Sequence, residues 1–230
     1  MAEGAGGDGR RQRWQAHREA RRAEMVQAAI RAIRRCGAGV GMEDIAAEAG
    51  VTKPVLYRYF ADRTDLYVAV GGWAAQDLLA KLAPRLEGVH ELRHDVAAMI
   101  NEYLLAIETE PELYRFVTSS ALADRRVEND LVNDYRKLIA AGITRVIGER
   151  MRAFGIDSGA AEPWGHGLVG MVQAAGDWWL DRRTMSRESL TEYLTDLIWA
   201  GFLGKIKASS AQPGGAVLRL ARNEEKAGDG

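Results

Sequence analysis

The sequence is poor in cysteine, in proline and in long apolar runs. Its 230 residues include one cysteine, Cys36, five prolines and 7% aromatic residues. A single cysteine excludes an intrachain disulfide and a cysteine-based zinc site. No run approaches the roughly 20 apolar residues of a membrane-spanning helix, and no apolar stretch typical of a signal peptide follows the first residues. We therefore expect a cytoplasmic protein without a membrane partner.

Alternating runs of Val, Ile and Thr are also missing, which excludes an extended β-sheet. Apolar residues recur instead at helical spacing, as Val26, Ala29, Ile30 and Ile33 do. We predict an all-α fold of about nine helices. Their approximate ranges are 14–36, 42–49, 53–60, 62–85, 90–109, 111–118, 125–154, 162–182 and 186–206.

The net charge of -1 conceals an uneven distribution of charge along the chain. Residues 10–63 contain twelve basic and six acidic residues, a net charge of +6, so the remaining residues carry -7. A basic segment joined to an acidic body is typical of a protein that binds nucleic acid at one end. A solvated, arginine-rich helix surface is the alternative explanation.

The most specific pattern in the sequence lies between Gly41 and Phe60. Ile45, Ala46 and Ala49 predict one apolar helix face, and Gly50 predicts a left-handed turn out of that helix. Thr52 then stands where it can cap a second short helix. Two short helices joined by a tight glycine turn form a helix-turn-helix, whose second helix enters the major groove of DNA.

This segment resembles the tetracycline-repressor (TetR) family of bacterial transcription factors. The matching positions are Ile45, Ala46, Ala49, Gly50, Val51, Lys53, Leu56, Tyr57 and Phe60, with Thr52 in place of the usual serine. The following segment, Asp62 to Leu66, also resembles the family, with Arg63 at a usual lysine. Gly41 replaces a threonine that caps the helix and binds phosphate in the family, and Glu43 occupies an often basic or polar position.

The resemblance implies a double-stranded DNA operator as partner. We expect Lys53 and Tyr59 to contact phosphates, and Val55, Tyr57 and Arg58 to lie near base edges. The complete predicted DNA-binding set is Thr52, Lys53, Pro54, Val55, Tyr57, Arg58, Tyr59 and Arg63. The arginine cluster over residues 10–22 either extends this surface along the DNA backbone or into the minor groove, or is a solvated, frayed helix start; the sequence leaves these alternatives open.

Four regions follow from these patterns. We predict a disordered arm over residues 1–13 and a three-helix DNA-binding domain over residues 14–63. A helical effector-binding and dimerisation domain follows over residues 64–207, and a flexible tail over residues 208–230.

The last two predicted helices carry wide apolar stripes. In the family these helices pair with a second subunit, and tryptophan is enriched at interfaces. The residues predicted for a homodimer interface are Leu168, Val172, Trp179, Leu194 and Ile198. Packing inside the chain's own core is the alternative for about half of the stripe.

The family also carries an effector pocket in its C-terminal body. We predict an apolar pocket for a small hydrophobic effector, with a long-chain fatty acid or acyl-CoA preferred on the resemblance of residues 167–180 to lipid-sensing members. The predicted lining residues are Met99, Tyr103, Ile107, Phe116, Leu138, Met171 and Trp178. Core packing is the alternative for each of them.

No arrangement of residues predicts catalysis, a metal site or a cofactor. Cys36 has no neighbouring histidine in the sequence, and no nucleophile elbow is present. We therefore expect a ligand-responsive repressor rather than an enzyme. A helical adaptor that has lost DNA binding and, less favoured, an all-helical enzyme are the alternatives.

Overall fold

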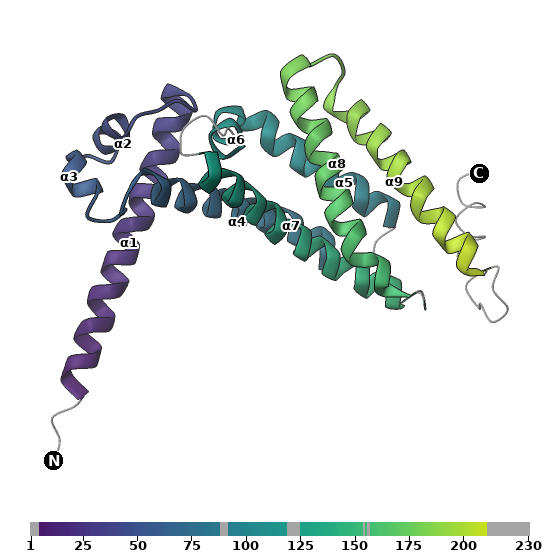
Figure 1. The fold of residues 1–230 in the computed structure, drawn as a ribbon, viewed down its shortest axis with the longest axis horizontal. Coiled ribbons are helices and arrows are strands. Elements are labelled where there is room, and N and C mark those ends of the chain that lie inside the picture. Colours follow the sequence, from purple (N-terminus) through teal and green to yellow (C-terminus); the bar gives the residue numbers. More distant parts are fainter. Residues whose placement is uncertain (1–4, 88–91, 119–124, 154, 156, 211–230) are drawn as a thin grey trace. The chain divides into compact units, whose positions relative to one another are not determined.

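The computed structural model describes residues 5–87, 92–118, 125–153, 155 and 157–210, and these residues form helices without a strand (Figure 1). The all-α prediction is confirmed, and the described residues contain nine α-helices and one short 3₁₀ helix, η1. The α-helices are α1 (Ala5–Cys36), α2 (Met42–Glu48), α3 (Lys53–Leu56), α4 (Arg63–Glu87), α5 (Leu92–Thr109), α6 (Pro111–Thr118), α7 (Arg125–Ala153), α8 (Ala161–Arg182) and α9 (Arg187–Ser210). The 3₁₀ helix η1 (Ser158–Ala160) precedes α8.

Three helices differ clearly from the ranges expected from the sequence. Helix α1 begins at Ala5 instead of Trp14, so residues 5–13 of the predicted disordered arm are helical. The good helix formers over residues 10–13 favour this extension, whereas the glycines over residues 5–9 do not explain it. Helix α3 ends at Leu56 instead of Phe60, and the chain continues in tight turns up to Phe60. Helix α9 ends at Ser210 instead of residue 206, so residues 208–210 of the predicted flexible tail are helical, and residues 211–230 lie outside the described residues.

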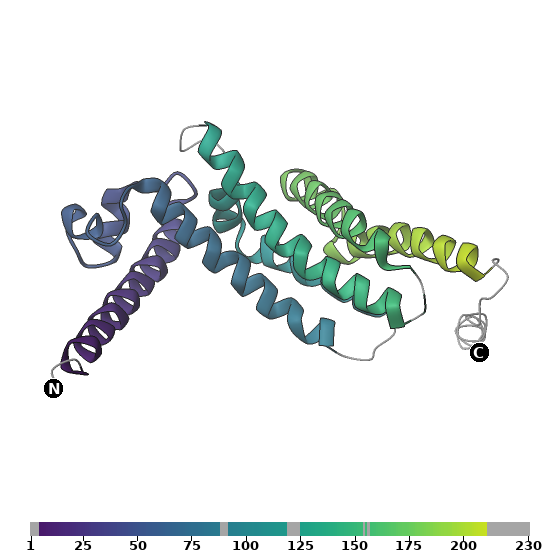
Figure 2. The ribbon, with the colours of Figure 1, turned by 60° about the horizontal axis from the view of Figure 1, so that its bottom comes forward.

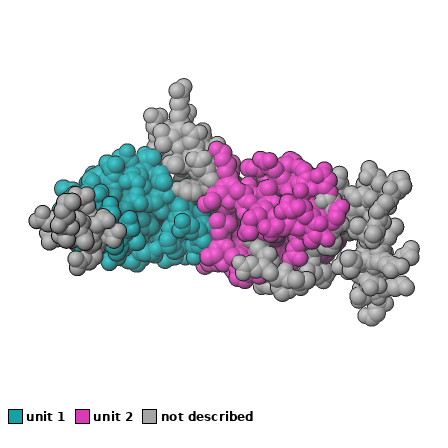
Figure 3. All heavy atoms as spheres, turned by 90° about the horizontal axis from the view of Figure 1, so that it is seen from below, with its two compact units in different colours: residues 1–77, 110–135 teal, residues 78–109, 136–230 magenta. Residues whose placement is uncertain are grey.

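The chain divides into two compact units (Figure 3). The N-terminal unit comprises residues 1–77 and 110–135, and the C-terminal unit comprises residues 78–109 and 136–230. Helix α6, distant from the first four helices in sequence, therefore belongs to the N-terminal unit. The four predicted regions remain a prediction.

The core of the N-terminal unit joins α1, α2, α3, α4 and α6. Its buried side chains include Ile30, Ile33, Ile45, Leu56, Phe60, Leu66 and Phe116. The ring of Phe116 stacks on that of Tyr67, with 4.1 Å between ring centroids. Such burial of apolar side chains is the main stabilising contribution to a domain of this kind.

Two carboxylates at the start of α6 hold the C-terminal end of α1. Glu110 forms an ion pair with Arg34 at 2.7 Å. Glu112 Oε2 accepts a hydrogen bond from the backbone N–H of Ala38 at 2.9 Å, in the connection between α1 and α2. This hydrogen bond lowers the pKa of Glu112 from its ordinary value. Helix α6 is thus bound to the first helices by polar contacts as well as by Phe116.

In the C-terminal unit, α5 packs against both α8 and α9 (Figure 1). Buried residues on this side include Leu104, Ile107, Trp179, Leu190 and Leu194. The connection from α8 to α9 is fixed by the Trp179 indole, whose Nε1 donates to the carbonyl oxygen of Met185 at 2.8 Å. None of the helices among the described residues combines the length and apolar character needed to cross a membrane.

Candidate DNA-binding surface

The turn between α2 and α3 has the geometry of a helix-turn-helix. Gly50 adopts a φ of 66°, in the left-handed region that glycine occupies without steric cost. Its N–H donates to the carbonyl of Ala47 at 3.0 Å, and the N–H of Val51 donates to that of Ala46 at 2.9 Å. These bonds end α2 and set the direction of the next helix, as the sequence predicted.

Helix α3 begins after Thr52, which occupies the N-cap position. The backbone carbonyl of Thr52 accepts hydrogen bonds from Val55 at 2.9 Å and from Leu56 at 3.1 Å. Its hydroxyl makes no capping hydrogen bond, so the expected side-chain cap is not formed. The exposed Thr52 hydroxyl is consequently available to an external acceptor or donor such as a phosphate oxygen.

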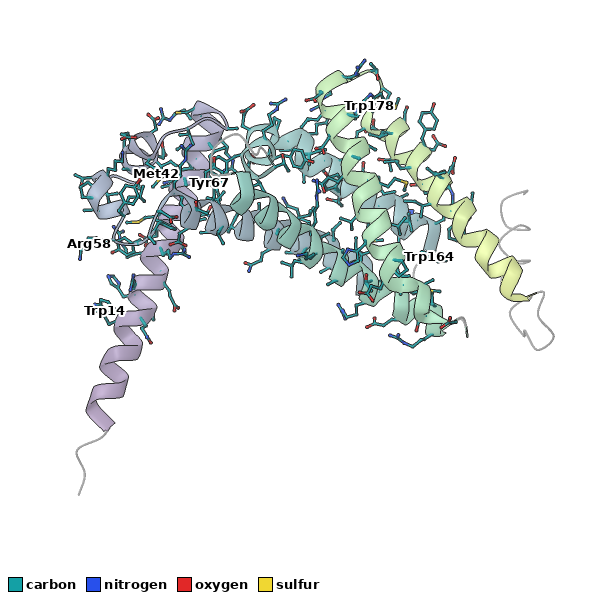
Figure 4. The ribbon with its side chains drawn as sticks, in the orientation of Figure 1. Trp14, Met42, Arg58, Tyr67, Trp164 and Trp178 are labelled. Carbon is teal, nitrogen blue, oxygen red and sulfur yellow. The ribbon has the colours of Figure 1, made fainter. Side chains whose placement is uncertain are left out.

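The residues from Thr52 to Phe60, here called the α3 segment, include both fully buried and exposed side chains. Leu56 and Phe60 are fully buried and anchor α3 and the following turns to the core, as expected for Phe60. Thr52, Pro54, Tyr57 and Arg58 are exposed, whereas Val55 and Tyr59 are half-buried and pack against the core. Figure 4 shows Arg58 directed away from the rest of the N-terminal unit. The outer surface of the segment is therefore polar, aromatic and basic.

Lys53 pairs with Glu43 across the helix-turn-helix. The ammonium of Lys53 donates a hydrogen bond to Glu43 Oε1; the Glu43 side chain is 69% exposed and the Lys53 side chain 42%. This hydrogen bond raises the pKa of Lys53 and lowers the pKa of Glu43 from their ordinary values. Lys53 must therefore exchange a carboxylate for a phosphate when it contacts DNA.

Arg63, at the start of α4, also has partners within the chain. Its guanidinium donates to the backbone carbonyl of Val40 at 3.4 Å and lies 5.7 Å from the ring centroid of Tyr67. The bond to Val40 holds the start of α4 against the connection between α1 and α2, whereas the contact with Tyr67 lies within α4 itself. The contact of Arg63 with DNA stays a prediction, as do those of the other seven residues.

Two arginines of α1 that the predicted site did not include contact the end of the α3 segment. Arg22 Nε donates to the carbonyl oxygen of Tyr59 at 3.3 Å, and its guanidinium forms an ion pair with Asp65 at 2.5 Å. Arg18 lies 3.5 Å from the carbonyl oxygen of Arg58. These residues are about forty positions apart in sequence, so their spacing carried no signal of the contacts.

The residues predicted to line an effector pocket fall into different environments. Phe116 is buried in the core of the N-terminal unit, and the other six residues belong to the C-terminal unit. Tyr103 and Ile107 face α8 at Gly176, where an added Cβ would lie 3.0 Å from each side chain. At 100° per residue, Met171 and Trp178 lie on the opposite side of α8. Met99 is half-buried and Leu138 is exposed. The pocket stays a prediction.

The residues predicted for a dimer interface are largely covered within the single chain. Trp179 and Leu194 are buried, and Leu168, Val172 and Ile198 are half-buried. Large apolar residues outside the predicted set are exposed on α9, namely Tyr193 at 63% and Leu197 at 62%, and Trp178 is exposed on α8 (Figure 4). Helical spacing identified apolar stripes but could not indicate which part another helix of the chain covers.

Comparisons with protein families match both parts of the chain. Residues 25–70 match the family described as bacterial regulatory proteins, tetR family. Residues 81–216 match a family described as a tetracyclin repressor-like C-terminal domain. The two matches cover the helix-turn-helix and most of the C-terminal unit.

Two relatives and one solved structure extend the comparison. An uncharacterized HTH-type transcriptional regulator of Mycobacterium tuberculosis (strain H37Rv) is 37% identical over 209 residues, 89% of this chain and 86% of the relative. The HTH-type transcriptional activator FasR of Mycolicibacterium smegmatis is 27% identical over 168 residues, 70% of this chain and 73% of FasR. The transcriptional regulator FadR from Bacillus subtilis, solved in complex with stearoyl-CoA, has a TM-score of 0.64 at 14% identity and covers 78% of this chain and 98% of that chain.

At 14% identity the likeness to FadR shows a shared fold alone. The family matches and the 37% identity to the mycobacterial regulator show more than the fold, because they extend over both the helix-turn-helix and the C-terminal unit. They exclude the enzyme alternative, since the matched proteins are regulators of transcription. The chain belongs to the TetR family of DNA-binding bacterial transcription regulators.

Proposed function

We propose that this regulator binds a two-fold symmetric operator as a homodimer and that a small hydrophobic effector, a long-chain fatty acid or its CoA thioester, releases it. The observation that carries the proposal is the exposed surface of the α3 segment. Leu56 and Phe60 of this segment are fully buried in the core, and its exposed residues are Thr52, Pro54, Tyr57 and Arg58. Residues held this rigidly can present their side chains to a groove with little loss of conformational entropy on binding.

The exposed residues divide into two roles on DNA. Lys53 and the hydroxyl of Thr52 suit phosphate oxygens, which position the protein without reading sequence. Arg58 and Tyr57 suit base edges in the major groove, where Arg binds the O6 and N7 atoms of guanine. Pro54 suits apolar contact with a thymine methyl group. Because Val55 and Tyr59 are half-buried, they support this surface more than they extend it.

We place the dimer contact on the exposed apolar residues of α8 and α9. Tyr193 and Leu197 are four residues apart and so share one face of α9, and Trp178 is exposed on α8. Exposed aromatic and aliphatic side chains of this size are typical of interfaces. A two-fold dimer presents two α3 segments to two half-sites of a palindrome.

The fatty-acyl effector rests on relatives rather than on a cavity. FadR of Bacillus subtilis was solved with stearoyl-CoA and shares the fold. An effector releases DNA only if it binds the free and DNA-bound conformations unequally. Repression is the proposed outcome of binding; activation is the second candidate, because FasR is named an activator. An operator that overlaps the promoter favours repression, and one upstream of it favours activation.

Selection of bound duplexes from a random library, with the full-length chain, tests DNA recognition. We expect an inverted repeat, bound in a salt-dependent manner and at least about tenfold more weakly by Tyr57→Ala. Lys53→Gln is expected to weaken binding to all sequences and to reduce the salt slope by about one for each protomer. Arg145→Gln, at an exposed position of α7, is the control and should bind normally. Undiminished binding by both α3 variants would refute the site, and failure to select any motif would favour the adaptor alternative.

Titration of the bound complex with stearoyl-CoA tests the effector. Release by stearoyl-CoA, but not by free CoA, is the expected result. If the protein stays bound to DNA to the same extent at all concentrations of stearoyl-CoA and of stearic acid, the fatty-acyl effector is refuted. The DNA-binding assignment would then remain intact.

A further inference from the structure

The N-terminal half of α1 extends beyond the packed part of the N-terminal unit. Helix α1 has 32 residues, but its buried positions begin only at Met25, and residues 14–20 are all exposed. Figures 1 and 2 show no other described helix of the N-terminal unit alongside this half. A helical segment of this length without tertiary packing is only marginally stable in water by itself, so packing does not explain its presence.

This half of α1 is strongly basic. Residues 10–21, here called the arginine helix, contain five arginines and one acidic residue, Glu19. Arg10, Trp14, His17 and Arg21 follow the spacing of one helix face. Trp14 is 64% exposed, and the guanidinium of Arg18 lies 5.9 Å from the centroid of its ring. Among the described side chains, those of Arg18 and Trp14 are exposed, so this part of the helix presents positive charge and an indole N–H donor to solvent.

The arginine helix adjoins the end of the α3 segment. Arg18 lies 3.5 Å from the carbonyl oxygen of Arg58, and Arg22 donates to that of Tyr59 at 3.3 Å. Arg58 itself is exposed on the proposed DNA-binding surface (Figure 4). From Arg18 to Ala5 the helix rises about 20 Å, which corresponds to about 6 bp of DNA.

We propose that the arginine helix is a second DNA contact, which binds the phosphate backbone of the duplex that flanks each half-site. The inference rests on the proposed DNA binding by α3 and adds a separate surface to it. Two observations support it: the charge of the helix is complementary to phosphate, and the helix is continuous with the α3 surface through Arg18 and Arg22. Phosphate contacts made in this way add affinity that falls with salt and carries little sequence preference.

Flank length provides the test. The full-length chain is titrated with the selected motif carrying flanks of about 2 bp or of about 10 bp on each side, across a range of salt concentrations. We expect wild type to bind the long duplex more tightly, and the triple variant R10Q/R11Q/R13Q to lose that gain while binding the short duplex normally. With one to three phosphate contacts per protomer, the slope of log K against log salt on the long duplex should become less steep by about 2 to 5 for a dimer.

A matched variant, R145Q/R152Q/R182Q, removes the same charge from exposed positions of the C-terminal unit and should retain the gain. Circular dichroism and melting establish that both variants fold. Equal binding to both flank lengths by wild type, or equal losses in the two triple variants, would overturn the inference and favour a solvated helix. A random-sequence duplex of about 30 bp should show the same slope difference, so the arginine helix is tested even if no motif is selected.

Discussion

Phe116→Ala is expected to destabilise the N-terminal unit severely, because the ring is part of its core. Phe116 is 1% exposed and stacks on Tyr67 with an interplanar angle of 9°. Removal of a buried phenylalanine side chain costs about 3–5 kcal/mol, since it combines lost apolar transfer energy with a cavity. At about 2–4 °C for each kcal/mol in a protein of this size, the melting temperature should fall by about 10 °C.

Thermal unfolding of the full-length chain, followed by circular dichroism or calorimetry, measures this loss. Leu138→Ala is the matched control, because the sequence predicted both residues for the same pocket. Leu138 is 48% exposed in the single chain, so its truncation should change the free energy of unfolding by no more than about 0.5 kcal/mol.

Stearoyl-CoA binding distinguishes the two interpretations of Phe116. If Phe116→Ala melts within about 2 °C of wild type and specifically weakens binding of stearoyl-CoA, Phe116 lines an effector site and the argument from core packing is refuted. A large loss of stability in Leu138→Ala would equally contradict the assigned difference between the two positions.

Three further predictions concern charge and assembly. Glu43→Gln is expected to tighten operator binding by about twofold for each protomer, because it frees Lys53 and removes a carboxylate near phosphate; fluorescence anisotropy measures it. Glu112→Gln should lower the melting temperature most at neutral pH. The hydrogen bond from Ala38 lowers the pKa of Glu112, so its stabilising contribution is complete above the ordinary value of 4.5 and is lost as the pH falls through the lowered pKa. Leu197→Glu should raise the dimer dissociation constant at least about tenfold in analytical ultracentrifugation.

Each of these changes has a matched control. Glu149→Gln removes an exposed carboxylate of α7 and should alter neither DNA affinity nor the melting temperature appreciably. Leu138→Glu introduces the same charge as Leu197→Glu at another exposed leucine and should leave the dimer intact. A difference in melting temperature between wild type and Glu112→Gln that stays constant from neutral to acidic pH would contradict the role of the Ala38 hydrogen bond. Weaker operator binding by Glu43→Gln would show that the carboxylate helps to orient Lys53 for DNA.

The helix-turn-helix could be predicted closely because its signals are local. Gly50 adopts the left-handed conformation expected for the turn, and Phe60 is buried as the apolar spacing indicated. The second helix was nevertheless predicted four residues too long. Its last turn is tightened because the amides of Arg58 and Tyr59 donate to carbonyls three residues earlier, a difference that apolar spacing does not distinguish.

The residues predicted for the effector pocket and for the dimer interface show which information a local sequence pattern lacks. Met171 and Trp178 share the apolar character of Val172 and Trp179 but lie on another side of α8 from them. Helix α5 packs against α8 at Gly176, and Trp179 is buried whereas Trp178 is exposed. Hydrophobicity alone assigned Trp178 to a pocket and Trp179 to an interface, without information on which face α5 covers.

The sequence by itself determined the helical class, the helix-turn-helix and the family, because turn chemistry, apolar periodicity and a specific motif act over a few residues. Only the tertiary structure decided that α6 joins the N-terminal unit, that Glu112 bonds to Ala38, and that Arg18 and Arg22 reach the end of the α3 segment. These contacts join residues about 40 to 74 positions apart. Periodicity shows which residues share a face of one helix, but the packing of the whole chain decides what each face meets.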